Sequence, residues 1–369
     1  MKKLVLATAV AALSVTAAQA APTVYGKVFL TLDLKDGDTD VTTVNHTTGK
    51  STTKSEDWSS EETRSQLNSN GSRIGIRGSE ALTANTDVVY QLEYGVDVDA
   101  NTDQFYSRDT YLGLSNKQYG TLLAGRLKAI DGRVDYANVT EGGVMGGDNV
   151  LASFDAKRAN NTFAYVAPTY NDVTVSAMYV MDENSDNVVT KNKVLDNDGN
   201  EIGYFETTKA GFDTFGRDAF GLAAQYEPNA PYRAGISYIQ AGDALKAVRL
   251  SGAYDLSPVY TIGALYQNTD RNTDDNENAF TLSVSHKVAQ TPWTTYGQID
   301  LVDNYFGAKD SEAQRVVIGG KYAYNRATTG HIYGAYLNKE VSKFDSTANT
   351  TKTTETSGFG VGAGLEYKF

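Results

Sequence analysis

The sequence predicts an all-β fold: a 16-stranded antiparallel transmembrane β-barrel. Apolar and polar residues alternate with a period of two along most of the chain, a pattern typical of strands. The connections between these segments alternate between tight turns and long polar loops. Beyond residue 21 there is no apolar run of about 18 residues, so no transmembrane helix is expected. A closed barrel is the other arrangement that pairs every backbone N–H and C=O in lipid.

The composition excludes several classes of protein. The 369 residues include 34 Gly and 24 Tyr but only 6 Pro and 2 Trp, which favours turns, strands and aromatic girdles. The formal net charge of −12 argues against nucleic acid as a partner, because binding phosphates requires a surplus of Lys and Arg. The absence of cysteine excludes disulfides, thiolate nucleophiles and Cys-based zinc sites. The three histidines lack metal-ligand spacing, and nothing in the sequence pairs a serine with His286 or His331, so we expect no metal, no cofactor and no enzyme activity.

Residues 1–20 are expected to be a cleaved signal peptide. Met1-Lys2-Lys3 is a short positive region, an apolar stretch follows, and Ala18-Gln19-Ala20 is a small-x-small cleavage pattern. A membrane anchor is the alternative, but the stretch is shorter than the ~20 residues that a span needs. The remaining residues, 21–369, are expected to form the barrel of an exported protein.

Strands can be located from the alternation alone. In 87–97, for example, one face carries Val88, Tyr90, Leu92, Tyr94 and Val96. Each predicted segment is close to the ~9–11 residues that a tilted membrane strand requires. The sixteen segments are 22–34, 70–78, 86–98, 104–115, 120–128, 158–167, 172–181, 217–227, 231–240, 246–256, 259–268, 277–288, 293–302, 313–324, 328–339 and 357–369.

The connections indicate which barrel class is present. Tight turns such as 168–171 and 228–230 alternate with long polar connections. These long connections are 35–69, 99–103, 129–157, 182–216, 269–276 and 340–356. Outer-membrane barrels have short periplasmic turns and long extracellular loops. A soluble β-sandwich is the alternative, but it gives no reason for long loops at every second connection.

Several motifs resemble those of Gram-negative general porins, most closely the neisserial-type branch. The segment 72–78 (SRIGIRG), together with 80–82 and 90–93, resembles their second and third strands. The segments 108–114 (RDTYLGL) and 120–126 (GTLLAGR) are similar to their fourth and fifth strands. Segment 320–328 resembles their penultimate turn, and 362–369 resembles their closing strand, which ends on Phe.

The resemblance implies a passive channel in the outer membrane of a Gram-negative cell. It implies a homotrimer in contact with outer-membrane lipid and lipopolysaccharide. It also implies folding by the barrel assembly machinery, which engages the strand that ends at Phe369.

Arginines on the early strands are predicted to line the pore. Arg73 and Arg77 share one strand face, with Ile74 and Ile76 on the other, so the alternation places both arginines in the lumen. Three more arginines lie near the ends of the next strands and are candidates for the same wall: Arg108, Arg126 and Arg158.

The long connection 129–157 follows the fifth strand and would be the third extracellular loop, which the resemblance to porins implies is folded inward into the barrel. Its predicted constriction residues are Asp131, Asp135, Glu141 and Asp148; it also carries Asp155 and a Gly-rich centre. Acids on this loop that face arginines on the wall would set a transverse field, and facing charges are how pores filter ions. The alternative is that these acids are ordinary solvated loop residues.

The predicted function is a general diffusion porin for ions and small hydrophilic solutes. Acidic outer loops, with Asp36, Asp38 and Asp40 among their residues, would raise the local cation concentration within a Debye length of ~8 Å. The wall arginines favour anions, and we expect a mild cation preference as the balance. One alternative is a substrate-selective channel, in which tyrosines could form a sugar track. Another is an adhesin that acts through its long loops.

Overall fold

The computed structural model describes residues 21–57, 65–101, 103–143, 145, 149–155, 157–184, 188–195, 201–209, 212–273 and 275–369. The expected signal peptide and Asp148 lie outside these ranges. Within them, no helix has both the length and the apolar character needed to cross a membrane.

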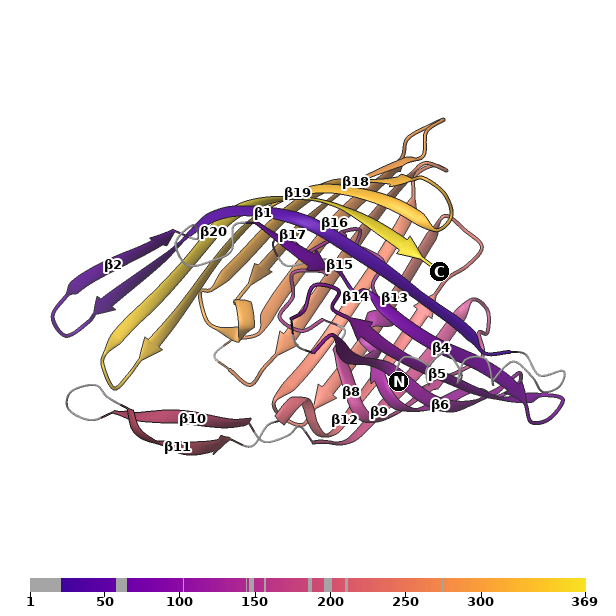
Figure 1. Cartoon of the computed structure of the whole chain (residues 1–369), viewed down its shortest axis with the longest axis horizontal. Coiled ribbons are helices and arrows are strands. Elements are labelled where there is room, and N and C mark those ends of the chain that lie inside the picture. The colour runs from indigo at the N-terminus through magenta and orange to yellow at the C-terminus, as the bar shows by residue number, and fades with distance from the viewer. Residues whose placement is uncertain are drawn as a thin grey trace.

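The described part of the chain is built almost wholly of strands (Figure 1). The strands are β1 (Thr23–Asn45), β2 (Lys50–Asp57), β3 (Ser65–Ser69), β4 (Arg73–Ala81), β5 (Thr86–Val96), β6 (Phe105–Asn116), β7 (Gly120–Lys128), β8 (Arg158–Val166), β9 (Val173–Asn184), β10 (Val188–Leu195), β11 (Glu201–Lys209), β12 (Phe212–Tyr226), β13 (Tyr232–Ala241), β14 (Leu245–Asp255), β15 (Tyr260–Asp270), β16 (Glu277–Lys287), β17 (Trp293–Asp303), β18 (Glu312–Ala323), β19 (Thr328–Asp345) and β20 (Thr350–Lys368). Two short 3₁₀ helices are η1 (Ile130–Arg133) and η2 (Tyr305–Gly307).

The strands close into a barrel of sixteen antiparallel strands, as the sequence predicts. From β4 onward each barrel strand pairs with the next, β9 pairs with β12, and β1 pairs with both β4 and β20. The short β3 also pairs with β1, so β3 and β4 are two parts of one barrel strand. The hairpins β1–β2 and β10–β11 add strands outside the ring. Strand β7 matches its predicted range of 120–128, and the other barrel strands overlap theirs.

The two faces of the sheet differ in composition. In β16 the side chains of Phe280, Leu282 and Val284 are exposed, whereas Thr281 and Ser283 between them are buried. Successive side chains on a strand point to opposite faces. The apolar residues therefore cover the outer face, which contacts lipid, and the polar residues cover the inner face.

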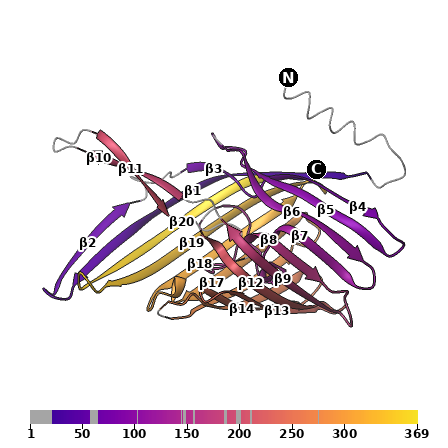
Figure 2. The same ribbon diagram turned by 90° about the horizontal axis from the view of Figure 1, so that it is seen from below.

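Three of the connections predicted as long loops contain strand structure. Strand β1 continues to Asn45 and pairs there with β2 and with the first half of β20. Strands β19 and β20 likewise extend into 340–356, and β10–β11 lie within 182–216. Figures 1 and 2 show these hairpins extending from the same end of the barrel. Threonine favours strands, and cross-strand hydroxyl pairs such as Thr42 and Thr53, 2.9 Å apart, stabilise such polar hairpins.

Segment 129–157 packs against the polar face of the sheet. A Cβ on Gly221 of β12 would lie 2.9 Å from a methyl carbon of Ile130, and one on Gly263 of β15 would lie 2.8 Å from the Cα of Ala137. Glycine at these positions therefore lets the segment approach the backbone of the wall. A buried apolar cluster joins the start of the segment to the same wall; it includes Ile130, Val134, Phe154, Phe215 and Ile239.

Candidate pore constriction

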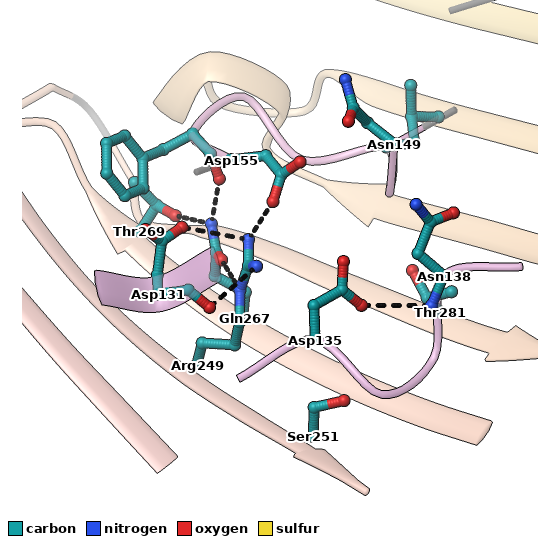
Figure 3. Close-up of polar contacts among 12 residues, drawn as sticks. Asp131, Asp135, Asn138, Asn149, Asp155, Arg249, Ser251, Gln267, Thr269 and Thr281 are labelled. Atoms are coloured by element: carbon teal, nitrogen blue, oxygen red, sulfur yellow. Dashed lines mark hydrogen bonds and ion pairs between the residues drawn. The ribbon is translucent and has the colours of Figure 1, made fainter. Parts of the chain in front are cut away.

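Arg249 of β14 ties both ends of segment 129–157 to the barrel wall. Its Nη2 lies 2.6 Å from Oδ1 of Asp155, near the end of the segment, and 3.5 Å from Oδ2 of Asp131, near the beginning. Its Nε donates a hydrogen bond to Oε1 of Gln267 at 2.7 Å. Figure 3 shows the two carboxylates turned toward this one guanidinium. The side chain of Arg249 is 1% exposed, and a charge so buried is stable only when it is paired.

A second buried arginine holds the middle of the segment. Arg315 of β18 pairs with Asp300 of β17 and donates hydrogen bonds to the carbonyl oxygens of Met145 and Asn149. Asp300 in turn accepts the backbone N–H of Leu151 at 3.3 Å. Both members of this ion pair therefore also form hydrogen bonds with the backbone of the segment.

Neutral and acidic wall side chains bind further backbone groups of the segment. The N–H of Val139 donates to Oε1 of Gln298 at 3.0 Å, and that of Ser153 donates to Oε1 of Glu277 at 2.9 Å. The N–H of Tyr136 donates to the hydroxyl of Ser251 at 3.0 Å. Buried polar groups are almost always paired in folded proteins, and here wall and segment satisfy each other. The segment is therefore fixed along the wall from β14 to β18.

A cavity of about 650 Å³ separates the segment from the opposite wall. Gly142, Gly143 and Asn149 of the segment line one side of it. Seven cationic side chains line it as well: Lys27, Arg73, Arg108, Arg126, Lys128, Lys157 and Arg158. Asp155 is the one acidic residue among the described residues of this lining.

Carboxylates behind the cavity neutralise part of this charge. Glu93 lies 2.5 Å from Nε of Arg108 and 3.5 Å from Nε of Arg73. Arg158 pairs with Asp109. In contrast, Lys128 and Lys157 have no ion pair with any described residue. The cavity therefore keeps a net positive charge.

The comparisons with known proteins identify the family. The family model for Gram-negative porins matches residues 6–343. The chain belongs to this family. "Major outer membrane protein P.IB" of Neisseria gonorrhoeae is 27% identical to this porin, over 95% of this chain and 98% of the relative. The protein of the same name from Neisseria lactamica is 26% identical over the same shares.

Solved porin structures share the fold of this porin. "Anion-selective porin from Comamonas acidovorans" aligns with a TM-score of 0.60 and 18% identity, covering 94% of this chain and 99% of that chain. "Outer-membrane expressed OmpT of Vibrio cholerae" aligns with a TM-score of 0.62 and 14% identity, covering 96% and 99%. The resemblance inferred from the sequence and the outer-membrane location are thus confirmed. The porin forms an outer-membrane diffusion channel, and the family is one of channels rather than enzymes.

Four of the five predicted arginines line the cavity of this porin: Arg73, Arg108, Arg126 and Arg158. Arg126 donates from Nη1 to Oδ1 of Asn160 at 2.5 Å. Arg77 does not line this cavity; its guanidinium carbon lies 4.9 Å from the ring centre of Tyr25. Of the two arginines that the alternation places in the lumen, only Arg73 lines this cavity, whereas the three candidates near strand ends all line it.

The predicted acids lie elsewhere. Asp131 binds Arg249, and Glu141 binds Lys321 of β18 at 2.7 Å. Asp135 accepts the backbone N–H of Asn138 at 3.1 Å and lies beside the same cluster (Figure 3). These three carboxylates do not line the cavity, and Asp148 is outside the described residues. Asp155 is the described acid that lies closest to the predicted arrangement.

Burial raises the pKa of Asp135 above its ordinary value, and the nearby carboxylate of Asp155 raises it further. The guanidinium of Arg249 and the backbone hydrogen bonds from Asn138 and Ala137 lower it, but they do not offset the burial. Ionisation of Asp135 is therefore less favourable in the folded protein than in water.

Sequence reasoning missed two buried arginines of the wall and the three lysines that line the cavity. They are Arg249, Arg315, Lys27, Lys128 and Lys157. A usable signal existed for Arg249, because it lies between Val248 and Leu250, whose exposed apolar side chains face outward. A lone charge between two lipid-facing residues must point into the barrel.

Proposed function

We propose that segment 129–157 narrows the lumen of this porin, and that ions and small hydrophilic solutes pass through the cavity between it and the basic wall. A barrel of sixteen strands is wide enough to leave an aqueous channel. The network around Arg249 and Arg315 supports this proposal, since it fixes the segment along one side of the barrel. Passage is passive, and the constriction sets an upper limit on solute size.

Ion selectivity depends on two opposed sets of charge. The mild cation preference predicted from the acidic outer loops stays a prediction. One observation favours a second candidate, a preference for anions: seven cations and one acid line the described part of the cavity. The Comamonas acidovorans porin, which has a similar fold, is described as anion-selective. Charges at a constriction act at shorter range and with less screening than charges in an outer vestibule.

Planar bilayer recordings of the porin purified from outer membranes test both points. The reversal potential in a KCl gradient gives the sign of selectivity. The double variant Lys128→Gln/Lys157→Gln removes two cavity cations that have no ion pair, and we expect its reversal potential to shift toward cations. Asp36→Asn/Asp38→Asn is the control, in the part of β1 that the sequence predicted as an outer loop, and we expect an opposite shift that is smaller. If only the control changes the potential, the vestibule sets the selectivity.

We further propose that the porin is a homotrimer in contact with outer-membrane lipid and lipopolysaccharide. A solved structure of OmpT from Vibrio cholerae with a similar fold is described as a trimer form. Crosslinking of the porin in intact outer membranes tests this proposal, with a ladder that ends at three subunits as the expected result. A band no larger than one subunit would contradict it.

Export and folding complete the proposal. Residues 1–20 are removed as a signal peptide, and the assembly machinery engages the strand that ends at Phe369, which pairs with Gly26 through two backbone hydrogen bonds. The N-terminal sequence of the purified porin and the membrane yield of Phe369→Ala test these two points. The substrate-selective and adhesin alternatives stay predictions, and partner binding that persists when the lumen is blocked would favour the adhesin.

A further inference from the structure

A second pocket lies inside the barrel, next to the constriction. It encloses about 280 Å³ between η1 and strands β5 to β9, close to the lower end of the range for small-molecule sites. Tyr111 and Gln91 line it, and both lie nearer the short-turn end of their strands than Arg108 and Glu93 of the basic cavity. A solute that leaves the constriction toward the short turns therefore passes this pocket.

The floor of the pocket is apolar, which is unusual for a surface that faces an aqueous lumen. Leu127, Ile130 and Met178 are buried there, and Leu123 and Ala164 are partly buried. Ile130 and Met178 also belong to the buried apolar cluster between the segment and the wall. An apolar body that covered this floor would remove the partly exposed surface of Leu123 and Ala164 from water, which is favourable.

Two cations stand at the rim without carboxylate partners. Arg133 and Lys128 are exposed and have no ion pair with any described residue. The acid of the lining, Asp109, is already paired with Arg158. Tyr111 also lines the pocket, and its hydroxyl can donate a hydrogen bond. The rim therefore carries a net positive charge above an apolar floor.

We propose that this pocket binds small amphiphilic anions, with a carboxylate at Arg133 and Lys128 and a compact apolar or aromatic body on Leu123, Leu127 and Met178. The inference rests on the open channel proposed above and names a class of solute that this channel retains for longer than others. An inorganic anion lacks the apolar body, and a neutral ring lacks the charge. Neither would make both contacts.

Single-channel recording with three probes tests the proposal. Benzoate carries both charge and ring, acetate carries the charge, and benzyl alcohol carries the ring. We expect benzoate to reduce the current saturably, at a half-blocking concentration about tenfold below those of the other two, because each of them loses one set of contacts. Equal effects of benzoate and acetate would overturn the apolar part of the proposal.

Three variants locate the site. Arg133→Gln and Leu123→Ala should each raise the half-blocking concentration of benzoate, by about five- to tenfold for the arginine. Lys157→Gln is the matched control, because it removes an unpaired cation from the constriction cavity but not from this pocket. If Lys157→Gln weakens the block as much as Arg133→Gln does, the general field of the lumen is responsible and the pocket is overturned.

Different outcomes test the proposed open channel and the proposed binding pocket. Absence of current before benzoate is added would overturn the open channel, and this inference with it. Normal current without a saturable block by benzoate would overturn the inference alone.

Discussion

Arg315 and Asp300 lie on adjacent strands, 2.9 Å apart, with 1% and 0% of their side chains exposed. A buried ion pair is stable only when further hydrogen bonds satisfy the remaining groups of both partners. Here the backbone of segment 129–157 supplies them, as carbonyl acceptors for Arg315 and as the N–H of Leu151 for Asp300. The pair and the segment therefore depend on each other.

Removing one partner should be costly. Asp300→Ala removes the carboxylate that pairs with the buried guanidinium of Arg315, and we expect the free energy of unfolding to fall by about 3–5 kcal/mol. Urea unfolding of the porin in detergent measures the change. Asp255→Ala is the matched control, since it breaks a pair with Arg233 whose side chains are 36% and 39% exposed. That control should cost at most about 1 kcal/mol, and equal losses in the two variants would contradict the account.

Removing the ion pairs of Arg249 should change the conductance of the channel more than it changes the barrel itself. Arg249→Gln keeps much of the side-chain volume but removes the charge that binds Asp131 and Asp155. We expect larger current noise and a changed mean conductance, because both ends of segment 129–157 lose their common anchor. Single-channel recordings measure this. Arg233→Gln, a change of the same type near a short turn, should leave the noise at the level of the parent porin.

The stability of the porin should respond to pH through Asp135. Because its pKa is raised in the folded state, the native protein binds more protons here than the unfolded chain does. Stability from this group is therefore greatest below the unfolded pKa of about 3.9 and is lost as pH rises through the folded pKa. Asp135→Asn removes this dependence. We expect the variant to gain in unfolding free energy relative to the parent porin as pH rises from acid to neutral, and a gain on acidification would contradict the sign.

Adding one methyl group to the wall should displace the segment. Gly263→Ala places a Cβ within 2.8 Å of Ala137 Cα and Tyr136 O, and within 2.7 Å of the hydroxyl of Ser283. Overpacking of this kind costs about 1–3 kcal/mol, and we expect a lower conductance because the segment can yield only toward the lumen. At Gly297 of β17 the nearest atom to an added Cβ is 3.8 Å away, so Gly297→Ala should change neither stability nor conductance.

The barrel could be predicted from the sequence because its cause is local. Lipid on one side and water on the other impose a period of two on every strand, and that period can be read without knowing which strands are neighbours. The same rule places Arg73 in the lumen. It locates strand ends less well where the chain leaves the membrane: β1 and β20 continue as polar hairpins, in which both faces meet water and the alternation disappears.

The partners of the loop acids could not be predicted in this way. Asp131 and Asp155 are separated along the chain by most of segment 129–157, yet they share one guanidinium on β14. Which wall they face depends on the path of the segment, and this path follows from non-local contacts such as its close approach to Gly221 and Gly263. A charge pattern shows that acids are present on a loop but not which way they turn.

Antiparallel pairing of β1 with β20 requires an even number of strands in the barrel. These first and last barrel strands pair antiparallel from Lys27 to Asn45, and this is possible because an even number of strands is counted around the ring. Deleting one internal strand would bring β1 and β20 together in parallel, and parallel pairing is slightly less stable per residue than the antiparallel pairing present here. Deleting a whole hairpin would preserve the antiparallel seam in a narrower ring. Sequence drift in this barrel can therefore lengthen or shorten its hairpins one residue at a time, but the ring keeps its antiparallel seam only when its width changes in steps of two strands.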